Sequence, residues 1–271
     1  MSYIVADILR KPELFQISRL DLEIILAKIL NCSRVLFYSN PEFCLMKKTF
    51  AELSSMAKKR KKGIPMAYLT NTKEFYGHNF YVDERVLIPR PETEMIVEAS
   101  SLLSPSSILD IGTGSGALSV TLKKIFVSAV VTAVDISQEA LEVAKINSTA
   151  LNASIELVKS DLLEAIEAKS EFDLIVANLP YVAVNQKKLM AKETLSHEPH
   201  GALFAGSDGL DLYRKCFAQL KDKKIKFKTF IGEFGFGQKS LIETELDLYF
   251  KGKYEIKNDL AGIPRIFIIK M

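Results

Sequence analysis

The sequence has little cysteine, no long hydrophobic run and almost no net charge. Its cysteines, Cys32, Cys44 and Cys216, are far apart and form no Cys-x-x-Cys pair. This spacing disfavours a disulfide framework or a zinc ribbon and favours a reducing compartment. No apolar run approaches the length needed to cross a bilayer, and no N-terminal stretch has the pattern of a secretory signal. We therefore expect a cytoplasmic protein without membrane contact.

The charge is balanced, with 36 lysines and arginines against 33 acidic residues and a net charge of +3 over 271 residues. This balance argues neither for nor against nucleic acid as a partner. A short basic run at residues 58–62 precedes Gly63. Cations in a last helical turn complement the helix dipole, and a following glycine is a common helix stop. We interpret the run as a solvated helix end, with contact to a polyanion as the alternative.

Residues 1–70 are expected to form a small helical domain. From Pro12 to Leu30 apolar residues recur at helical spacing, and Ser18 with Asp21 resembles a capping box. A second helix is expected after Pro41 and should end with the basic run.

Residues 71–92 are expected to form a β-hairpin linker, because apolar residues alternate there between turn residues such as Gly77. The linker runs into residues 89–94 (Pro-Arg-Pro-Glu-Thr-Glu), in which two prolines bracket an arginine and two acids open the next helix. This stiffened segment leads directly into the third part of the chain, residues 93–271.

Strands and helices alternate in residues 93–271, which predicts a parallel sheet covered on both faces. A helix is expected near residues 185–195, another ends near Leu220, and a third follows the fifth strand. The last two strands are separated only by the short loop 258–264, so the final strand should run antiparallel to its neighbour. We therefore expect a doubly wound α/β sheet with one reversed strand. The strands are expected at residues 108–111, 129–135, 155–159, 172–178, 226–231, 253–257 and 265–270.

A glycine turn follows the first of these strands, at residues 110–116 (Asp-Ile-Gly-Thr-Gly-Ser-Gly). Its third glycine stands one position earlier than in the dinucleotide fingerprint Gly-x-Gly-x-x-Gly. Asp135 ends the next strand, where a carboxylate commonly binds the hydroxyls of a ribose. These features fit a site for NAD or for S-adenosylmethionine, and the glycine spacing disfavours a nicotinamide-dependent oxidoreductase.

A polar-proline-aromatic tetrad, Asn178-Leu179-Pro180-Tyr181, follows the fourth strand. Proline restricts its own φ angle and the residue before it, so the tetrad predicts a stiff loop. The Asn178 side chain and a neighbouring backbone carbonyl can accept hydrogen bonds from a planar amide or amine, and Tyr181 offers a ring to pack on it. Together with the glycine turn, the tetrad indicates methyl transfer to nitrogen.

These motifs carry a family resemblance. The glycine turn with Asp135 is similar to the cofactor motif of class I S-adenosylmethionine-dependent methyltransferases. More narrowly, the chain resembles the release factor glutamine methyltransferases, which modify the glutamine of the Gly-Gly-Gln loop in peptide chain release factors. The segments that carry this likeness span nearly the whole chain in the family order: 74–77, 87–94, 178–181, 198–210 and 259–265.

The resemblance implies a Rossmann-like methyltransferase sheet of seven mostly parallel strands with a reversed C-terminal strand. It also implies S-adenosylmethionine as methyl donor, release factors as protein substrates, a monomer, no direct nucleic-acid contact and no metal. The implied substrate and catalytic residues are Asn178, Leu179, Pro180 and Tyr181. The implied cofactor residues are Gly112, Thr113, Gly114, Ser115, Gly116, Asp135, Asp161, Leu162 and Asn178.

Two positions depart from the family pattern. The tetrad is usually Asn-Pro-Pro-Tyr, whereas this chain has Leu179; a backbone carbonyl is kept, but the loop loses some stiffness. Asn71 stands where the family generally has glycine, and asparagine tolerates a left-handed backbone well. The Asn-Leu-Pro-Tyr spelling is also similar to that of ribosomal RNA adenine dimethyltransferases. Methylation of adenine N6 in RNA or DNA is therefore the alternative function, and a non-catalytic translation-binding protein would require a broken site.

Two further features are weaker. His197 and His200 form His-x-x-His without a third ligand, so we expect no metal centre there. The family resemblance implies that this segment is a wall of the site. Glu233 stands at the end of the strand 226–231, where it can form a structural hydrogen bond or support the site from behind.

Overall fold

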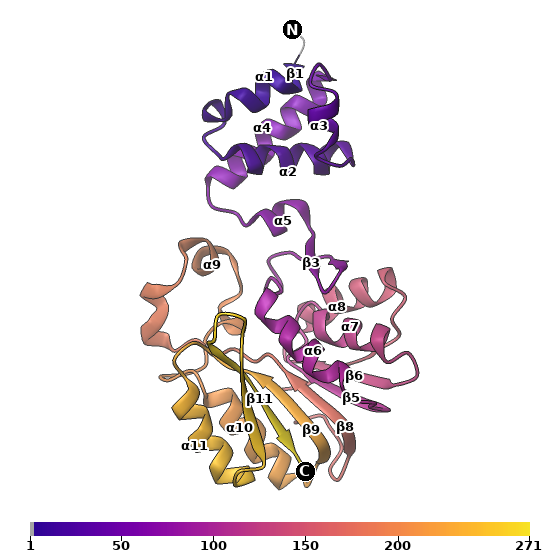
Figure 1. Ribbon diagram of the computed structural model, residues 1–271, viewed down its shortest axis with the longest axis vertical. Helices are drawn as coiled ribbons and strands as arrows, with labels where there is room; N and C mark the ends of the chain where they lie inside the picture. The colour runs from indigo at the N-terminus through magenta and orange to yellow at the C-terminus, as the bar shows by residue number, and fades with distance from the viewer. Residues whose placement is uncertain (1–2) are drawn as a thin grey trace. The chain divides into compact units, whose positions relative to one another are not determined.

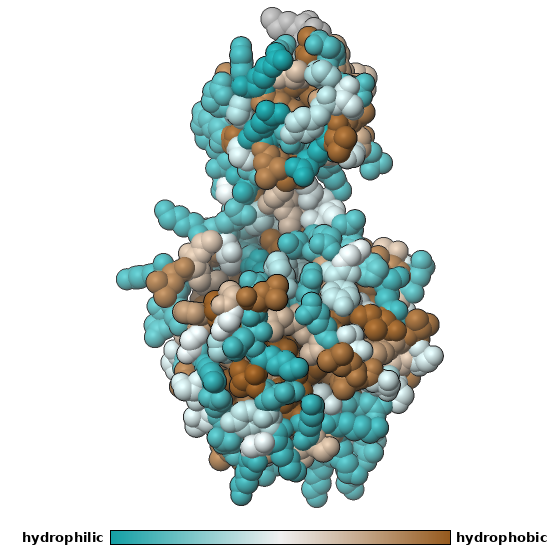
Figure 2. Space-filling view, in the orientation of Figure 1, coloured by the Kyte–Doolittle hydropathy of each residue, from teal (hydrophilic) through white to brown (hydrophobic). Residues whose placement is uncertain are grey.

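The computed structural model describes residues 3–271, so Met1 and Ser2 of the expected helical domain lie outside the described residues. The chain divides into two compact units (Figure 1). One unit comprises Met1–Thr72 together with Ala191–His197, and the other comprises Lys73–Met190 together with Glu198–Met271. We call them the helical unit and the sheet unit. In the space-filling view, polar side chains cover much of the visible surface, with apolar patches between them (Figure 2).

The helical unit is built on one apolar core in which side chains of α1, α2, α3 and α4 meet. Fully buried members include Val5, Leu22, Ile25 and Leu53. The strand pair β1–β2 is antiparallel and joins Tyr3 to Leu45. The elements of this unit are β1 (Tyr3–Ile4), α1 (Val5–Arg10), the 3₁₀ turn η1 (Pro12–Leu14), α2 (Arg19–Leu30), α3 (Leu36–Ser39), β2 (Cys44–Leu45), α4 (Lys47–Lys61), α5 (Met66–Thr70) and α9 (Lys192–His197).

The helix expected over residues 12–30 begins later than its apolar pattern indicates. Residues 12–14 form a 3₁₀ turn, and Gln16 then adopts a left-handed backbone with φ 55°, which interrupts any continuous helix. Ser18 starts α2, because its Oγ accepts a hydrogen bond from the Asp21 amide at 3.0 Å. The capping role of Ser18 is confirmed, and the earlier start is wrong.

The basic run 58–62 coincides with the end of α4, as expected, and Gly63 follows with φ 88°. Arg60 differs from the lysines around it, because its side chain is only 21 % exposed and makes two ion pairs. Its guanidinium lies 3.1 Å from the Asp21 carboxylate on α2 and 2.7 Å from the Glu193 carboxylate on α9. Arg60 therefore attaches the distant segment 191–197 to the helical unit and is not part of a solvated helix end.

The hairpin that opens the sheet unit is shorter than expected. Strands β3 (Lys73–Phe75) and β4 (His78–Phe80) pair antiparallel around Gly77, which has φ 75°. Residues 81–90 form no strand, so only the first part of the expected linker 71–92 is a hairpin. Side-chain contacts fix that segment instead, as the site geometry below shows. The rings of Phe75 and Phe80 are almost fully buried and pack edge to face.

The sheet unit contains a seven-stranded sheet in the order β10-β11-β9-β8-β5-β6-β7. Parallel pairs join β9, β8, β5, β6 and β7, while β11 runs antiparallel to both of its neighbours, β9 and β10, so β11 alone of the seven is reversed. The prediction of a doubly wound, mostly parallel sheet with a reversed C-terminal strand is confirmed. The strands are β5 (Ser107–Ile111), β6 (Val130–Asp135), β7 (Glu156–Lys159), β8 (Glu171–Ala177), β9 (Lys226–Glu233), β10 (Tyr254–Asn258) and β11 (Pro264–Lys270).

Two separate apolar cores lie on the two faces of this sheet. One packs α10 and α11 onto the sheet through residues such as Tyr213 and Phe217, and the other packs α6, α7 and the β3–β4 hairpin onto the opposite face. The strands supply alternate residues to each core, Leu109 and Ile111 to one and Ile108 to the other. The helices are α6 (Glu94–Ser101), α7 (Ala117–Ile125), α8 (Gln138–Ala150), α10 (Asp211–Asp222) and α11 (Lys239–Phe250), with 3₁₀ turns η2 (Pro91–Thr93), η3 (Val184–Leu189) and η4 (His200–Ala202).

The helix expected near residues 185–195 is absent as a single element. The segment forms the 3₁₀ turn η3 and then α9, and only α9 belongs to the helical unit. Met190, between the two elements, has an extended backbone with φ −80° and ψ 152°, so the helix is interrupted there. No helix among residues 3–271 is long and apolar enough to span a membrane.

We expect Arg60→Met to lower the free energy of unfolding by about 1–3 kcal/mol, because it leaves two carboxylates without their partly buried cation. Lys59→Met is the matched control at an exposed neighbouring position and should change stability by about 0.5 kcal/mol or less. Urea denaturation of both variants measures the difference. Equal effects would contradict a structural role for Arg60.

Candidate active site

The glycine turn and the tetrad follow the ends of two neighbouring strands. Strand β5 ends at Ile111 and β8 ends at Ala177, and these two residues are partners in a parallel pair. The turn 112–116 and the tetrad 178–181 follow directly, so the central strand pair places both loops at the same carboxyl edge. A Cβ atom on Gly112 would lie 3.1 Å from Leu179 Cδ2, which shows that the two motifs touch.

The glycine turn adopts a backbone that other residues rarely take. Gly112, Gly114 and Gly116 have φ angles of 75°, 54° and 80°. Gly116 packs against Ala144 of α8, whereas a Cβ on Gly114 would meet no atom within 4 Å. The amides of Gly112 and Thr113 donate to the Val134 carbonyl of β6, which fixes the start of the turn. Gly114 therefore faces open space that a ligand can enter.

Asp135 ends β6 beside this turn. Its carboxylate accepts hydrogen bonds from the Gly114 and Ser137 amides, both at 2.9 Å. Burial raises the pKa of Asp135. An ionised carboxylate has about four acceptor positions, so these hydrogen bonds leave capacity for a ligand. The Asp135 carboxylate and Gly114 therefore lie close enough to contact the same ligand.

A pocket of about 380 Å³ opens next to Asp135. Asp161 lines it, and the Asp161 carboxylate lies 2.5 Å from Lys215 Nζ. Ile136 also lines the pocket and its side chain is 64 % exposed; sequence reasoning missed this residue, although its place after the strand-end acid was a usable signal. The Leu162 side chain is buried in the sheet core, and Leu162 does not line this pocket.

Asp110 lies beneath the glycine turn and is fully buried. Its Oδ2 accepts hydrogen bonds from the Thr113 hydroxyl at 2.7 Å and the Ser119 amide at 3.1 Å. Its Oδ1 is buried and has no hydrogen-bond partner among residues 3–271. Burial raises the pKa of Asp110 to about 6. An unpaired buried acceptor costs about 1–3 kcal/mol unless a ligand or water satisfies it.

The first and last residues of the tetrad are tied to a buried carboxylate. Asn178 Nδ2 donates to the Thr93 hydroxyl at 2.8 Å, and that hydroxyl donates to Glu233 Oε2 at 2.6 Å. The Tyr181 hydroxyl donates to Glu233 Oε1 at 2.9 Å. Glu233 stands at the end of β9 and is 1 % exposed. Burial raises the pKa of Glu233 and also that of Tyr181, so the phenol stays protonated.

Gln238 holds the backbone of the tetrad. Its Nε2 donates to the carbonyls of Tyr181 and Asp208 at 2.7 and 2.8 Å, and its Oε1 accepts from the Gly235 amide at 2.7 Å. Gly209 has φ 84° and lies so close to the Tyr181 carbonyl that any side chain there would collide with it. Sequence reasoning missed Gln238, because a single glutamine carries no local pattern.

The segment before the sheet is fixed by a buried ion pair. Arg90 Nη2 lies 2.6 Å from Glu198 Oε1, and the Ile88 amide donates to Glu198 Oε2 at 3.1 Å. The Glu198 side chain is only 2 % exposed. The arginine between two prolines therefore anchors this loop to residue 198, next to the expected wall of the site.

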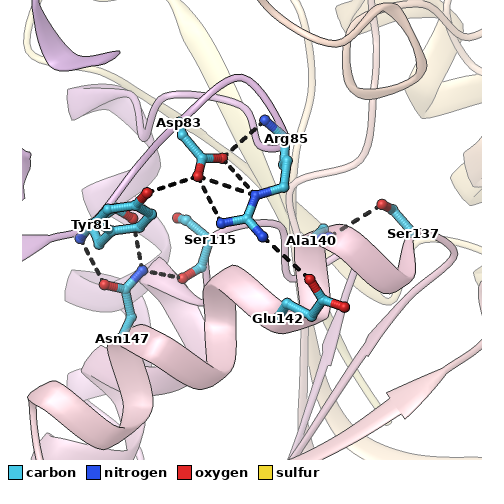
Figure 3. Close-up of polar contacts among 8 residues, drawn as sticks. All are labelled: Tyr81, Asp83, Arg85, Ser115, Ser137, Ala140, Glu142 and Asn147. Atoms are coloured by element: carbon cyan, nitrogen blue, oxygen red, sulfur yellow. Dashed lines mark hydrogen bonds and ion pairs between the residues drawn. The ribbon is translucent and has the colours of Figure 1, made fainter. Parts of the chain in front are cut away.

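A second polar network supports the glycine turn from the side (Figure 3). Asn147 of α8 accepts from the Tyr81 amide at 2.7 Å and donates to the carbonyls of Tyr81 and Ser115 at 2.9 and 2.8 Å. The Asp83 carboxylate bonds the Tyr81 hydroxyl and the Arg85 guanidinium. These contacts hold residues 81–85 against α8 in place of the expected strand pairing.

The two histidines of the His-x-x-His pattern belong to different units, His197 to the helical unit and His200 to the sheet unit. Within residues 3–271, no three histidine, cysteine, aspartate or glutamate side chains are grouped so that they could hold a metal ion.

Comparison with known proteins gives two family matches and close relatives over nearly the full chain. A model described as "Methyltransferase small domain" matches residues 92–208, and one described as "PrmC N-terminal domain" matches residues 9–70. The "Release factor glutamine methyltransferase" of Koribacter versatilis is 37 % identical over 92 % of this chain and 90 % of that protein. The protein of the same name from Leptospira interrogans is 36 % identical over 97 % of this chain and 94 % of that protein.

Solved structures with similar folds include a methyltransferase from Pyrococcus furiosus. It has a TM-score of 0.53 and 18 % identity and covers 73 % of this chain and 91 % of its own. The N-terminal domain of human METTL16 has a TM-score of 0.52 and 15 % identity and covers 91 % and 94 % of the two chains. At these identities the likeness concerns the fold alone.

We expect Asp110→Asn to stabilise the free protein by about 1–3 kcal/mol at pH 8. The folded pKa of about 6 lies above the ordinary value of 3.8, so the native state binds the proton more tightly than the unfolded chain. The stability that this proton contributes is fully present below about pH 4 and is lost as the pH rises through about 6. Asparagine carries no charge to bury, so the gain should shrink towards pH 4. Urea denaturation at both pH values measures it, and an equal gain at both would contradict the burial argument.

Proposed function

Because the chain belongs to the release factor glutamine methyltransferase family, we propose that it transfers a methyl group from S-adenosylmethionine to the side-chain amide nitrogen of glutamine in the Gly-Gly-Gln motif of release factors. One observation carries this proposal. The glycine turn and the tetrad are in contact through Gly112 and Leu179, so a methyl donor in the turn and an amide held by the tetrad would be neighbours.

The residues around the turn fit S-adenosylmethionine. Gly114 faces open space, and the Asp135 carboxylate keeps acceptor positions for the ribose hydroxyls. The pocket lined by Ile136 and Asp161 has room for the adenine. The cofactor supplies a sulfonium methyl group that is already activated by positive charge. We assign its binding to residues 112–116, Asp135, Asp161, Leu162 and Asn178.

The tetrad would supply the substrate site. An amide nitrogen is a weak nucleophile, because its lone pair is delocalised into the carbonyl. Positioning must therefore provide much of the rate. Asn178 Oδ1 and the Leu179 carbonyl would accept the two amide hydrogens, which aims the nitrogen at the methyl group and stabilises the positive charge that develops on it. Pro180 stiffens the loop, and Tyr181 would pack on the amide plane.

A strong general base is not required in this scheme. The amide proton becomes acidic only as the carbon–nitrogen bond forms, and the acceptors at Asn178 and Leu179 then stabilise it until water removes it. Glu233 does not serve as the base, because it is 1 % exposed and is linked to Asn178 only through the Thr93 hydroxyl.

Exposed apolar side chains near the site suit a protein substrate. Phe236 follows β9 and is 71 % exposed, and Leu260 on the loop between β10 and β11 is fully exposed. Glu233 pairs with Ile266 at the start of β11, so both loops lie at the sheet edge that carries the tetrad.

We further propose a monomer that works in the cytoplasm without direct contact to nucleic acid. Adenine methylation is not favoured, because the relatives that match over nearly the full chain are named for glutamine.

Mass spectrometry of the Gly-Gly-Gln peptide tests this function. A purified release factor incubated with the protein and S-adenosylmethionine should gain one methyl group on the glutamine, and a release factor with asparagine at that position should gain none. Ribosomal RNA incubated in parallel with labelled cofactor should stay unlabelled. Label in RNA with an unshifted peptide would establish the adenine alternative instead.

Asn178→Ala should lower kcat for release factor methylation by about 100- to 1,000-fold, because it removes one of two acceptors for the amide hydrogens. Asn79→Ala, at an exposed position on the β3–β4 hairpin, is the matched control and should keep the wild-type rate. Transfer of labelled methyl groups under saturating cofactor measures both. A near wild-type rate for Asn178→Ala would exclude the assigned role.

A further inference from the structure

Glu233 is a buried carboxylate with no salt bridge among residues 3–271, a property that it shares with Asp110. Its two hydrogen-bond donors are uncharged hydroxyls, from Thr93 and Tyr181. The nearby Arg265 is engaged by Asp259, with its Nε 3.0 Å from that carboxylate. By contrast, the buried Glu198 is paired with Arg90. Burying a charge without a counter-ion is costly, so stability alone does not explain why a carboxylate occupies this position.

The contacts of Glu233 fix the direction of every hydrogen bond in the network. An ionised carboxylate can only accept, so the hydroxyls of Thr93 and Tyr181 must both donate to it. Two such donors also favour its ionised form against the effect of burial. The Thr93 hydroxyl has then used its only hydrogen and can only accept from Asn178. Asn178 must therefore turn its NH₂ group towards Thr93.

The orientation of this amide decides what Asn178 offers to a substrate. With Nδ2 bound to Thr93, the side-chain oxygen is the free group; among the described residues it accepts no hydrogen bond. A reversed amide would present NH₂ to the NH₂ of a substrate and would repel it. The two orientations have nearly the same shape, so packing cannot select between them and a hydrogen-bond partner must.

We propose that Thr93 and Glu233 are positioning residues that set the amide orientation of Asn178 and hold Tyr181, so that the tetrad presents an acceptor to its substrate nitrogen. The effect of this orientation on catalysis rests on the proposed function, whereas the orientation itself does not. It assigns a purpose to the threonine within Pro-Arg-Pro-Glu-Thr-Glu, which reaches the tetrad from a segment 85 residues away in the chain.

Three substitutions separate positioning from simple packing. Thr93→Val keeps the shape but removes the acceptor for Asn178, whereas Thr93→Ser keeps the hydroxyl and loses only a methyl group. Glu233→Gln keeps the shape of residue 233 but adds a donor, so the Thr93 hydroxyl can reverse and donate to Asn178. We expect Thr93→Val and Glu233→Gln to lower kcat by about 10- to 100-fold with little change in KM for release factor. Thr93→Ser should stay close to wild type.

Nuclear magnetic resonance of the free protein gives a readout that does not depend on any substrate. The side-chain amide resonances of Asn178 are identified by their loss in Asn178→Ala. Thr93→Val and Glu233→Gln should shift these resonances and speed their hydrogen exchange, and Thr93→Ser should not. Thermal denaturation of each variant shows whether it is folded at the assay temperature. If Thr93→Val is unfolded there, Glu233→Gln alone tests the proposal.

The outcomes distinguish the two proposals. A wild-type protein that leaves release factor unmodified would refute the proposed function, while the resonance shifts would still decide the orientation of Asn178. An active wild type whose Glu233→Gln and Thr93→Val variants keep both kcat and the Asn178 resonances would overturn the positioning role alone. Equal losses in Thr93→Ser and Thr93→Val would also overturn it, because packing would then explain both.

Discussion

The parallel pairing of β5 with β8 is the constraint on which the rest of the site depends. Its register places Ile111 beside Ala177, so the glycine turn and the tetrad begin at the same level of the sheet. Both strands are central and are buried on both faces, which leaves their ends little freedom to shift. The contact between Gly112 and Leu179 follows from this register, and a side chain at position 112 would be strained at φ 75° and would crowd Leu179 Cδ2 at 3.1 Å.

The buried carboxylates of the sheet unit include Asp110, Glu198 and Glu233, and two of these three lower the stability of the fold because they lack a cation. Glu198 has a cation, but Asp110 and Glu233 bind only neutral donors, and Asp110 keeps one oxygen without a partner. Each unpaired charge weakens the fold. Their places are informative, because Asp110 lies under the glycine turn and Glu233 lies behind the tetrad. The free-energy cost of these buried carboxylates therefore falls beside the proposed cofactor and substrate sites.

The fold could be predicted well from the sequence, since apolar runs and turn residues mark each strand of the sheet within about two residues. The short final loop also dictated the reversed β11. Local patterns failed where distant side chains decide the structure. Residues 81–85 belong to the expected hairpin linker but are held by side chains that include Asn147 of α8, and the helix expected near residues 185–195 is divided between the units.

The same distinction holds for the candidate site. Glycine spacing, the strand-end Asp135 and the tetrad carry strong local signals, and the structure brings them together. The supporting residues Thr93 and Gln238 carry no such signal, because their role depends on partners 85 and 57 residues away. The position of Glu233 at a strand end suggested a supporting contact, but the direction of its hydrogen bonds could only follow from the folded chain.

Leu179 shows how such distant contacts can replace a local constraint. A proline at this position would stiffen the tetrad by restricting its backbone, and leucine lacks that effect. Here the Leu179 side chain is 2 % exposed and packs into the sheet core against Gly112. Gln238 fixes the carbonyl of Tyr181, and Val182 pairs with the segment at Phe204. The tetrad loop is therefore fixed at the Leu179 side chain, at the Tyr181 carbonyl and at Val182, which follows it. These tertiary contacts supply the backbone rigidity that a proline would add.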